Sequence, residues 1–556
     1  MSFFRRPFSQ REAAPGEAHQ DGQDGDADVV SDGSLQFVAE KGGNDSGITY
    51  QEASGAPVES TSPMGYHANS LFLIFLNVGK MIGTGVFSTP STILTGTGSV
   101  GVAMIWWALG FFTSASSLSV YMEYLAYFPN RSGSEVVYLE QAYPRPRYLF
   151  ATAFAFQSVV LSFGSANATV LAQYLFRISG RSPAAWEQKG VAIAAYTVAT
   201  LLVALHTKFS FRFTIAIGIV KVLTLVFISI TGWVVLSGRT SVANPHANFE
   251  NAFEGKATPY GLTNSLVKII FAYAGYENAF NVVNEVKVVP KAELKAAAQV
   301  SASLFFQKVF GSSNATRGLN FLIALSAFGN LITVLIGVSR MIRECGRQGV
   351  LLWPRFWAST RPFGTPLGPY LVQWGFTVVV LLAIPAGDAF NFVANLKTYP
   401  NAVFNVAMAS GIYIIRFRRK RLGLPRPSYR AWDVSVIFAI MVHVYLLIMP
   451  WYPPDGGPFA GDVSFWYATY VVTGIGFLLA CGTYYTVWIY VLPKLRKYQL
   501  RQTVVTYENG AQSHNIVQVP NAEVERWDAT HDAVGREISL ETHSHSSEKE
   551  VSGTKV

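Results

Sequence analysis

The sequence predicts an all-α integral membrane protein, and its composition and charge distribution are the observations that predict this class. Half of the 556 residues are hydrophobic and only 14% are charged, whereas a soluble chain carries roughly a quarter charged residues. The mean hydropathy is +0.27. The charges are also bunched, and the stretches between them are about 20 residues or longer, which is the length of a transmembrane helix.

The remaining composition excludes other classes. The net charge of +9 does not indicate a nucleic-acid-binding protein, because the positive residues gather at the ends of the apolar segments. Cys345 and Cys481 are the only cysteines, which excludes a disulfide framework and a cysteine-based metal cluster. No constellation of His, Asp, Glu or Cys lies within the apolar segments, so we predict no enzyme activity, no metal and no cofactor.

In chain order, a polar and acidic tail covers residues 1–65, which we expect to be disordered and to contain no cleavable signal peptide. A second polar tail, residues 498–556, is expected to be disordered as well. The membrane domain between them, residues 66–497, contains eleven apolar segments that are long enough to span a bilayer. These segments are residues 68–96, 100–128, 148–176, 188–206, 210–237, 262–284, 317–342, 369–387, 392–416, 432–451 and 463–492.

The lysines and arginines between the spans predict the orientation of the chain. The densest basic segments are residues 340–355, 416–430 and 494–501, and all three should lie in the cytoplasm. By the same rule Lys287 and Arg343 should both be cytoplasmic, yet only one predicted span lies between them. Two crossings are required, so either the charge rule misleads at this point or a helix is absent from this sequence.

Two of the predicted spans, the first and the sixth, are interrupted. A Gly-Thr-Gly triplet at residues 83–85 interrupts the first, and the sixth carries Gly275, Glu277 and Asn278 among apolar neighbours. Paired breaks in corresponding spans of two five-helix halves indicate a transporter site. The free N–H groups of one half-helix suit a carboxylate and the free C=O groups of another suit an ammonium, so together they fit an α-amino acid. The alternative is that Gly79 and Gly83 form a small-xxx-small pattern for helix packing.

Ionisable side chains within the spans are candidates for function because they are costly at membrane depth. Lys221 stands alone in the fifth span and is a candidate for proton coupling or for a fixed cation. The alternative is a lysine that snorkels or ties helices together. Glu277 can bind a proton, orient the break or shape the pocket. We expect Glu123 and Glu285 to be structural or gating residues, and Lys80 to snorkel to the interface.

Four motifs resemble a known family, namely NVGKMIGTGVFSTPS, GSEVVYLEQAYPRPRYL, FAYAGYENAFNVVNEVK and IALSAFGNLITVLIGVSRMIRECGRQGVLLWP. They are similar to the L-type amino acid transporter branch of the amino acid–polyamine–organocation superfamily. Within this branch the chain resembles fungal high-affinity methionine permeases, over nearly all of residues 66–497. The resemblance implies a LeuT-like fold of two inverted five-helix repeats plus two helices, in the plasma membrane and with both tails in the cytoplasm.

The resemblance also implies which residues bind the substrate. The first break would hold the substrate carboxylate, and its residues are Ile82, Gly83, Thr84, Gly85 and Val86. The second break would hold the ammonium and form an aromatic gate, and its residues are Phe271, Ala272, Tyr273 and Gly275. Lys221 matches the lysine of the family's fifth helix.

One departure from the family is large. In the family a complete seventh helix follows the motif NEVK, but here Lys287 and Val288 run almost directly into Pro290. The missing helix matches the charge mismatch found above. Our hypothesis is an exon lost from the gene model or a spliced variant, which leaves about eleven spans in place of twelve.

The function that the resemblance implies is uptake of methionine or another large neutral L-amino acid by alternating access, coupled to protons. Amino acid exchange is one alternative, and the missing helix keeps open a non-transporting amino acid sensor or a defective splice variant. Residues 177–190 contain no cysteine, so a disulfide-linked heavy chain is not expected. Lys41 is a candidate ubiquitin acceptor, and a ubiquitin-ligase adaptor would then bind the N-terminal tail. The alternative is a solvated lysine.

Overall fold

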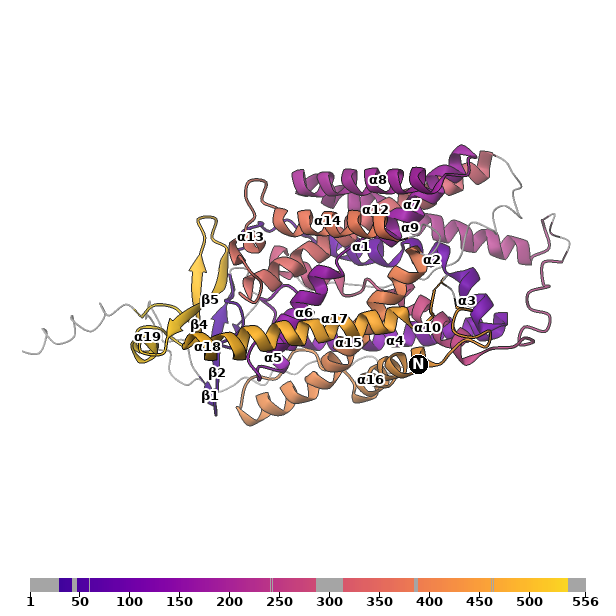
Figure 1. Cartoon of the computed structure of the whole chain (residues 1–556). Helices are drawn as coiled ribbons and strands as arrows, with labels where there is room; N and C mark the ends of the chain where they lie inside the picture. Colours follow the sequence, from indigo (N-terminus) through magenta and orange to yellow (C-terminus); the bar gives the residue numbers. More distant parts are fainter. Residues whose placement is uncertain are drawn as a thin grey trace, which may run out of the picture.

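The computed structural model describes residues 30–42, 48–59, 61–240, 242, 244–286, 314–384, 389–461, 463 and 465–538. They form a bundle of long helices with the strands gathered at one end (Figure 1). Each of the eleven predicted apolar segments contains a helix. Eight of the described helical segments are long and apolar enough to cross a membrane, so the protein is an integral, multi-pass membrane protein.

The helices of the predicted spans are α1 (Ser70–Met81), α2 (Thr84–Ser88), α3 (Pro90–Thr97), α4 (Val100–Tyr127), α6 (Leu149–Val160), α7 (Ser165–Ser179), α8 (Ala185–Leu205), α9 (Thr207–Leu236), α10 (Pro259–Tyr273), α12 (Asn314–Arg347), α14 (Leu367–Ala383), α15 (Ala389–Arg421), α16 (Asp433–Ile448) and α17 (Thr469–Thr486). The shorter helices are α5 (Glu135–Ala142), α13 (Pro354–Ala358), α18 (Leu492–Arg496), α19 (Val524–Thr530), the 3-10 helices η1 (Asn278–Glu285) and η2 (Met449–Trp451), and the π-helix η3 (Val487–Val491).

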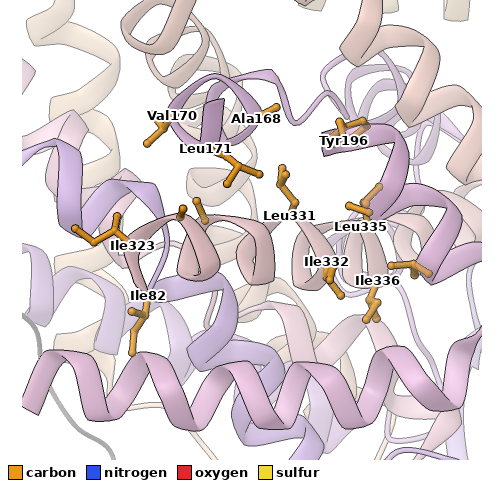
Figure 2. Packing of buried hydrophobic residues seen from close by; sticks show 14 of the residues in the cluster. Ile82, Ala168, Val170, Leu171, Tyr196, Ile323, Leu331, Ile332, Leu335 and Ile336 are labelled. Carbon is orange, nitrogen blue, oxygen red and sulfur yellow. The ribbon is translucent and has the colours of Figure 1, made fainter. Parts of the chain in front are cut away.

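The largest apolar core surrounds α12, which packs against α1, α7, α8, α9 and α14. Leu331 and Leu335 of α12 face Leu171 of α7 and Tyr196 of α8 in this core, whereas Ile332 points to the opposite side of α12 (Figure 2). All five side chains are at most 3% exposed. Burial on several sides fixes the position of α12, and α12 then presents polar side chains to the end of α1.

The expectation of disordered tails is wrong for the described parts of both tails. The N-terminal tail contains the antiparallel sheet β1 (Val30–Asp32), β2 (Leu35–Lys41) and β3 (Ile48–Glu52). A second antiparallel pair, β4 (Tyr498–Thr506) and β5 (Gln512–Pro520), pairs Tyr498 with Pro520 and Thr506 with Gln512. The average composition of the tails concealed their local pattern, which is a run of β-branched residues followed by Asn509-Gly510, a strong turn signal.

Several sequence-based expectations fall outside the described residues. The ends of the tails, residues 1–29 and 539–556, belong to this group. So do residues 287–313, where the sequence predicts that a helix is missing.

Candidate substrate-binding site

The first break lies between α1 and α2. Helix α1 ends at Met81, Ile82 and Gly83 have non-helical backbone angles, and α2 begins at Thr84. The N–H groups of the first turn of α2 therefore have no acceptor in a preceding turn of helix. Thr84, Gly85 and Val86 are buried, so these groups face the interior of the bundle.

The second break follows α10. The helix ends at Tyr273, Ala274 is extended, and Gly275 has a φ of +139°, a conformation that favours glycine. A Cβ on Gly275 would lie 2.8 Å from the backbone nitrogen of Met81, at the end of α1. A Cβ on Gly85 would lie 2.9 Å from the Cα of Ala272. The structure thus brings the two breaks into direct contact, and glycine makes the contact feasible from each side.

Side chains from α12 bind the carbonyl groups that the end of α1 leaves free. The amide Nδ2 of Asn330 donates to the carbonyl of Lys80 at 2.6 Å and to that of Gly79 at 3.2 Å. The hydroxyl of Ser326 donates to the carbonyl of Ile82 at 3.2 Å. An unwound segment in a membrane needs such partners, because no water or helical neighbour is otherwise present to satisfy its backbone.

Three further asparagines connect the breaks to each other and to α7. Asn77 of α1 donates to the carbonyl of Tyr276 at 3.1 Å and accepts from the N–H of Ala279 at 2.8 Å. Asn167 of α7 accepts from the hydroxyl of Thr84 and donates to Asn330 at 2.6 Å. Asn278 donates to the carbonyl of Thr333 at 2.9 Å.

Sequence analysis placed Asn278 in the second break but missed Asn77, Asn167, Ser326 and Asn330. Their signal is an amide or hydroxyl side chain within an apolar span, where hydrogen bonding between helices is the usual reason for its presence.

The ionisable groups near the breaks are paired with each other or with backbone. Lys221 of α9 is 1% exposed, and its ammonium donates to the carbonyl of Gly79 at 2.7 Å. The expectation that Lys80 snorkels is wrong, because its Nζ lies 2.7 Å from Glu277 Oε1, across the two breaks. Glu277 also accepts from the N–H of Gly275 at 2.8 Å, so one carboxylate ties both broken segments together.

Glu123 and Glu285 lie in buried ion pairs away from the breaks. Glu123 is 2.7 Å from Arg416 of α15, and Glu285 is 2.7 Å from Arg340 of α12. Both carboxylates are fully buried and therefore join helices that are distant in sequence.

Two lysines that sequence analysis did not single out also lie within the predicted spans. Lys268 of α10 is fully buried and donates to Asn395 at 3.0 Å and to Asn391 at 3.1 Å. The ammonium of Lys397 in α15 donates to the carbonyl of Phe163 at 2.6 Å, and its nitrogen lies 4.7 Å from the centroid of the Phe163 ring.

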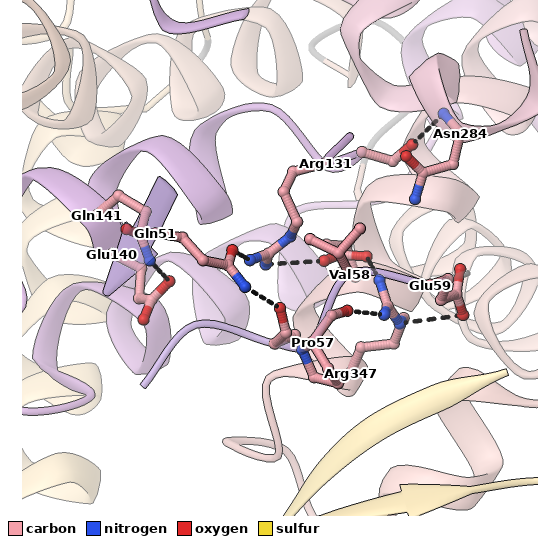
Figure 3. A network of polar contacts seen from close by, with 12 residues as sticks. Gln51, Pro57, Val58, Glu59, Arg131, Glu140, Gln141, Asn284 and Arg347 are labelled. Carbon is pink, nitrogen blue, oxygen red and sulfur yellow. Dashed lines mark hydrogen bonds and ion pairs between the residues drawn. The ribbon is translucent and has the colours of Figure 1, made fainter. Parts of the chain in front are cut away.

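The end of the bundle at which α12 ends is covered by both tails. We call this cover the tail cap, and it consists of β2, β3, residues 53–59, β4 and β5. Arg347 is central to it: its guanidinium is 2.6 Å from Glu344 and donates at 2.6 Å to the carbonyls of Pro57 and Gln512 (Figure 3). Glu59 pairs with Arg343 at 2.7 Å.

Burial under the tail cap shifts the pKa of two groups. Burial, opposed by Arg131 and reinforced by Glu52, raises the pKa of the Glu140 carboxyl to about 7. Burial and the guanidinium groups of Arg131 and Arg347 lower the pKa of His514 to about 3, which keeps that imidazole neutral.

A metal site is not found among the described residues, where no group of three or more His, Cys, Asp or Glu side chains could hold an ion. The arrangement of the breaks instead brings together the N–H groups of the first turn of α2, the last turn of α10 and the Lys80–Glu277 ion pair. Such a set of groups can hold a zwitterion by hydrogen bonds and charge.

Comparisons with known proteins agree with this chemistry. The family model described as "Amino acid permease" matches residues 69–298 and 287–477. The high-affinity methionine permease of Saccharomyces cerevisiae is 32% identical over 513 residues, which cover 86% of this chain and 89% of the relative. The low-affinity methionine permease of the same organism is 24% identical and covers 86% of this chain and 94% of the relative. The b(0,+)-type amino acid transporter 1 of Mus musculus is 26% identical and covers 68% of this chain and 81% of the relative.

Proposed function

The chain belongs to the amino acid permease family, and on that premise we propose that it carries methionine or another large neutral L-amino acid across the plasma membrane. The observation that carries the proposal is the contact between the two breaks, at which Gly85 meets Ala272 and Gly275 meets Met81. The similarity to methionine permeases over 86% of the chain supports methionine as the substrate.

In the proposed site the two breaks hold opposite ends of the substrate. The amides of Thr84, Gly85 and Val86 bind the carboxylate, because they form the first turn of α2 and lie at its positive dipole end. The amides of Ile82 and Gly83, which the sequence also suggested, already donate to the carbonyls of Val78 and Met81. The carbonyls of Phe271, Ala272 and Tyr273 bind the ammonium, since α10 ends there. Phe271 closes the site as a gate, and Gly275 lets α10 and α1 meet.

Alternating access then follows from movement of the broken helices against α12 and α9. The Lys80–Glu277 ion pair and Asn77 keep the two breaks together as one moving unit. The contacts from Lys221, Asn330 and Ser326 to the carbonyls of α1 are the bonds that must exchange during the movement.

We place proton coupling at Lys221. When protonated, its ammonium holds the carbonyl of Gly79 and thus fixes α1 against α9. Loss of the proton removes charge from that contact and weakens it, which lets α1 move. Glu277 is the second candidate, because it lies in the break itself; amino acid exchange without protons is the alternative mechanism.

The proposed orientation places the tail cap in the cytoplasm. The three basic segments of the sequence all lie at this cap: Arg347 binds residues 57 and 512, Arg419 donates to the carbonyl of Tyr50 in β3 at 3.1 Å, and residues 498–501 begin β4. Lys41, the candidate ubiquitin acceptor, is the last residue of β2 and thus part of the cap.

A second candidate function, a non-transporting sensor or a defective splice variant, is favoured by one observation. The family match is divided into two segments that meet at residues 287–298, where the sequence predicts a missing helix. Sequencing the transcript across the codons for Asn284 to Ala292 tests this point. About 30–40 additional apolar codons would restore a spanning helix, whereas a transcript that matches the present sequence would favour the sensor or the defective variant.

Uptake of labelled methionine tests the leading proposal, in cells that lack their own methionine permeases. We expect saturable uptake that increases as the external pH falls. Uptake that is independent of pH but accelerated by internal methionine would replace symport by exchange. Methionine binding by the purified chain without uptake would replace transport by sensing.

A further inference from the structure

Glu135 is a partly buried carboxylate that the proposed transport cycle does not use. It is the first residue of α5 and accepts hydrogen bonds from two hydroxyls. The hydroxyl of Tyr121 in α4 donates to Glu135 Oε1 at 2.6 Å, and that of Ser134 donates to Oε2. Unlike Glu277, which pairs with Lys80, Glu135 forms no ion pair with the residues that the structure describes. A carboxyl group in such a place is a candidate for binding a proton.

A sharp turn fixes the position of Glu135. Gly133 has a φ of +98°, and Ser134 has a φ of +41°, which is uncommon for a residue with a side chain. A Cβ on Gly133 would lie 2.5 Å from the Cβ of Glu344 in α12, so glycine is required at this close approach. The turn thus holds the start of α5 between α12 and the hydroxyl of Tyr121.

The ring of Tyr121 connects Glu135 to the second break. Tyr121 is 3% exposed, and its ring centroid lies 5.7 Å from that of Tyr276 and 5.5 Å from that of Phe280. Both of these residues follow the second break, and the carbonyl of Tyr276 accepts from Asn77 of α1. One side chain therefore separates the carboxyl of Glu135 from the segment that joins the second break to α1.

The other end of α5 contacts the tail cap. The hydroxyl of Ser54 donates to Glu140 at 3.0 Å, and the N–H of Glu52 donates to the amide oxygen of Gln141 at 2.8 Å. The proposed orientation places the tail cap in the cytoplasm. In that orientation α5 runs from the second break to the cytoplasmic end of the bundle.

The groups around Glu135 do not neutralise its charge. Among the described residues, its titratable neighbours are uncharged or acidic, and they are Tyr121, Tyr138, Tyr276, Glu277 and Cys345. The cations of the adjoining segments are bound elsewhere. Arg131 and Arg347 pair with Glu344, and Arg418 of α15 donates to backbone carbonyls at the far end of α5.

The balance of these effects favours a proton on Glu135. Burial, opposed by the hydroxyls of Ser134 and Tyr121, raises the pKa of the Glu135 carboxyl above 4.5. A carboxyl with a raised pKa binds a proton more tightly in this arrangement than in water. By linkage, the proton stabilises the present arrangement, and this stabilisation is lost as the pH rises through the raised pKa.

We propose that Glu135 is a proton-binding residue of the transport cycle, which holds the segment after the second break in place while protonated and releases its proton to the cytoplasm when that segment opens. The proton leaves the carboxyl for water, and the carboxylate that remains is hydrated. Glu135 thus acts on the second break, whereas Lys221 acts on the first. This inference rests on the proposed function, because it assumes that the breaks move during transport.

Thiol labelling of the purified full-length chain tests the proposal without transport. Asn281 of η1 is 2% exposed, so Asn281→Cys, in a chain without Cys345 and Cys481, reports opening of the segment after the second break. Its rate is divided by that of an exposed cysteine, which cancels the titration of the thiol itself. We expect this ratio to rise with pH above about 4.5, by at most about tenfold per pH unit, and to level off above the raised pKa.

Two variants separate a proton-binding role from a structural one. Glu135→Gln is neutral at every pH, so labelling should stay at the slow rate of low pH and lose its pH dependence. Tyr121→Phe removes a hydroxyl that stabilises the charged carboxylate, so the pKa of Glu135 should rise further and labelling should level off at a higher pH. A purely structural role of Tyr121 would instead change the rate by the same factor at every pH.

Glu140→Gln is the matched control. Glu140 lies on the same helix and also accepts from a serine hydroxyl, and burial raises its pKa to about 7, but it contacts the tail cap. This variant should leave the pH dependence of labelling at residue 281 unchanged.

The outcomes distinguish this proposal from the proposed function. Equal pH dependence in the wild type and in Glu135→Gln overturns the role of Glu135, and if Glu135→Gln does not fold, an unchanged profile in Tyr121→Phe overturns it. Absence of methionine uptake by the wild type overturns the transport proposal alone, because labelling still decides whether a proton on Glu135 controls the break. In proteoliposomes, Glu135→Gln should also remove the dependence of uptake on internal pH, while the KM of methionine stays within about threefold.

Discussion

Replacing Arg347 by methionine should release the tail cap. The guanidinium is fully buried, and it binds the carboxylates of Glu344 and Glu59 and the carbonyls of Pro57 and Gln512. Methionine retains most of the volume, so the change removes the charge and the hydrogen bonds without leaving a large cavity.

The expected magnitude follows from the groups that lose their partner. Two buried carbonyls become unpaired, at about 1–3 kcal/mol each. Glu344 keeps its ion pair with Arg131 at 3.1 Å, and Glu59 keeps its ion pair with Arg343 at 2.7 Å, so each carboxylate loses only one of two partners. Breaking a buried ion pair typically costs about 3–5 kcal/mol, and we take this range as the total because the contributions are not additive. It corresponds to a population of the open cap that is larger by about two to nearly four orders of magnitude.

Thiol labelling at a buried position within the cap measures this opening. Ser513 of β5 is fully buried, and Ser513→Cys in a background without Cys345 and Cys481 supplies a single thiol. Its labelling rate follows the open population when opening and closing are fast. We expect the rate to rise at least about a hundredfold with Arg347→Met. Arg421→Ala, which removes an exposed pair with Asp32, is the control and should have little effect. Equal rates in both variants would refute the reasoning.

Three further predictions concern the site and the cap. Gly85→Ala should abolish uptake although the protein reaches the cell surface in normal amounts, because the new Cβ would lie 2.9 Å from the Cα of Ala272. Gly482→Ala is the control and should transport normally, because a Cβ there would meet no atom within 4 Å. Asn330→Ala should lower the melting temperature in detergent, because the carbonyl of Lys80 loses its donor, at roughly 2 kcal/mol, while the carbonyl of Gly79 keeps Lys221. An unchanged melting temperature would contradict this. The pKa of Glu140 is raised from 4.5 to about 7, so closure of the cap is favoured by protonation: this stabilisation is complete below about pH 4.5 and is lost as the pH rises through 7. The rate is divided by that of an exposed cysteine, which cancels the pH dependence of the thiolate itself, and is compared with Glu140→Gln, which retains the opposing titration of His514. Relative to these references, labelling at residue 513 should slow between pH 8 and pH 6 by at most about tenfold per pH unit, and equal pH dependence with and without Glu140→Gln would contradict the prediction.

The positions of the spans could be predicted because each is a long stretch with few charges. The breaks could be predicted as well, since glycine and charge within an apolar segment are local signals. The partner of Lys80 could not, because Glu277 lies 197 residues away and only the folded bundle brings them together. The same holds for Asn330, whose role depends on α12 passing the end of α1.

The tails were mispredicted for a different reason. Their average composition is polar, and we took that average as the sign of disorder. The hairpin of β4 and β5 depends on the order of residues within a short segment, which averaging removes. The guanidinium of Arg347 binds this hairpin at Gln512, and that of Arg131 binds β3 at Gln51; no property of the tail sequences reveals either contact.

The bond between Glu59 and Gln512 has a consequence for biosynthesis. The N–H of Gln512 donates to Glu59 at 3.3 Å, and the two residues are 453 positions apart. A ribosome therefore completes every membrane span before the last partner of Arg347 is made. In a chain that stops before β4, the guanidinium of Arg347 lacks its cover, and so do the carboxylates of Glu344 and Glu59. The rest of the helix bundle has by then been made. The closed cap thus marks a chain whose synthesis has passed β5, and cellular quality control can recognise this state at the surface of the protein.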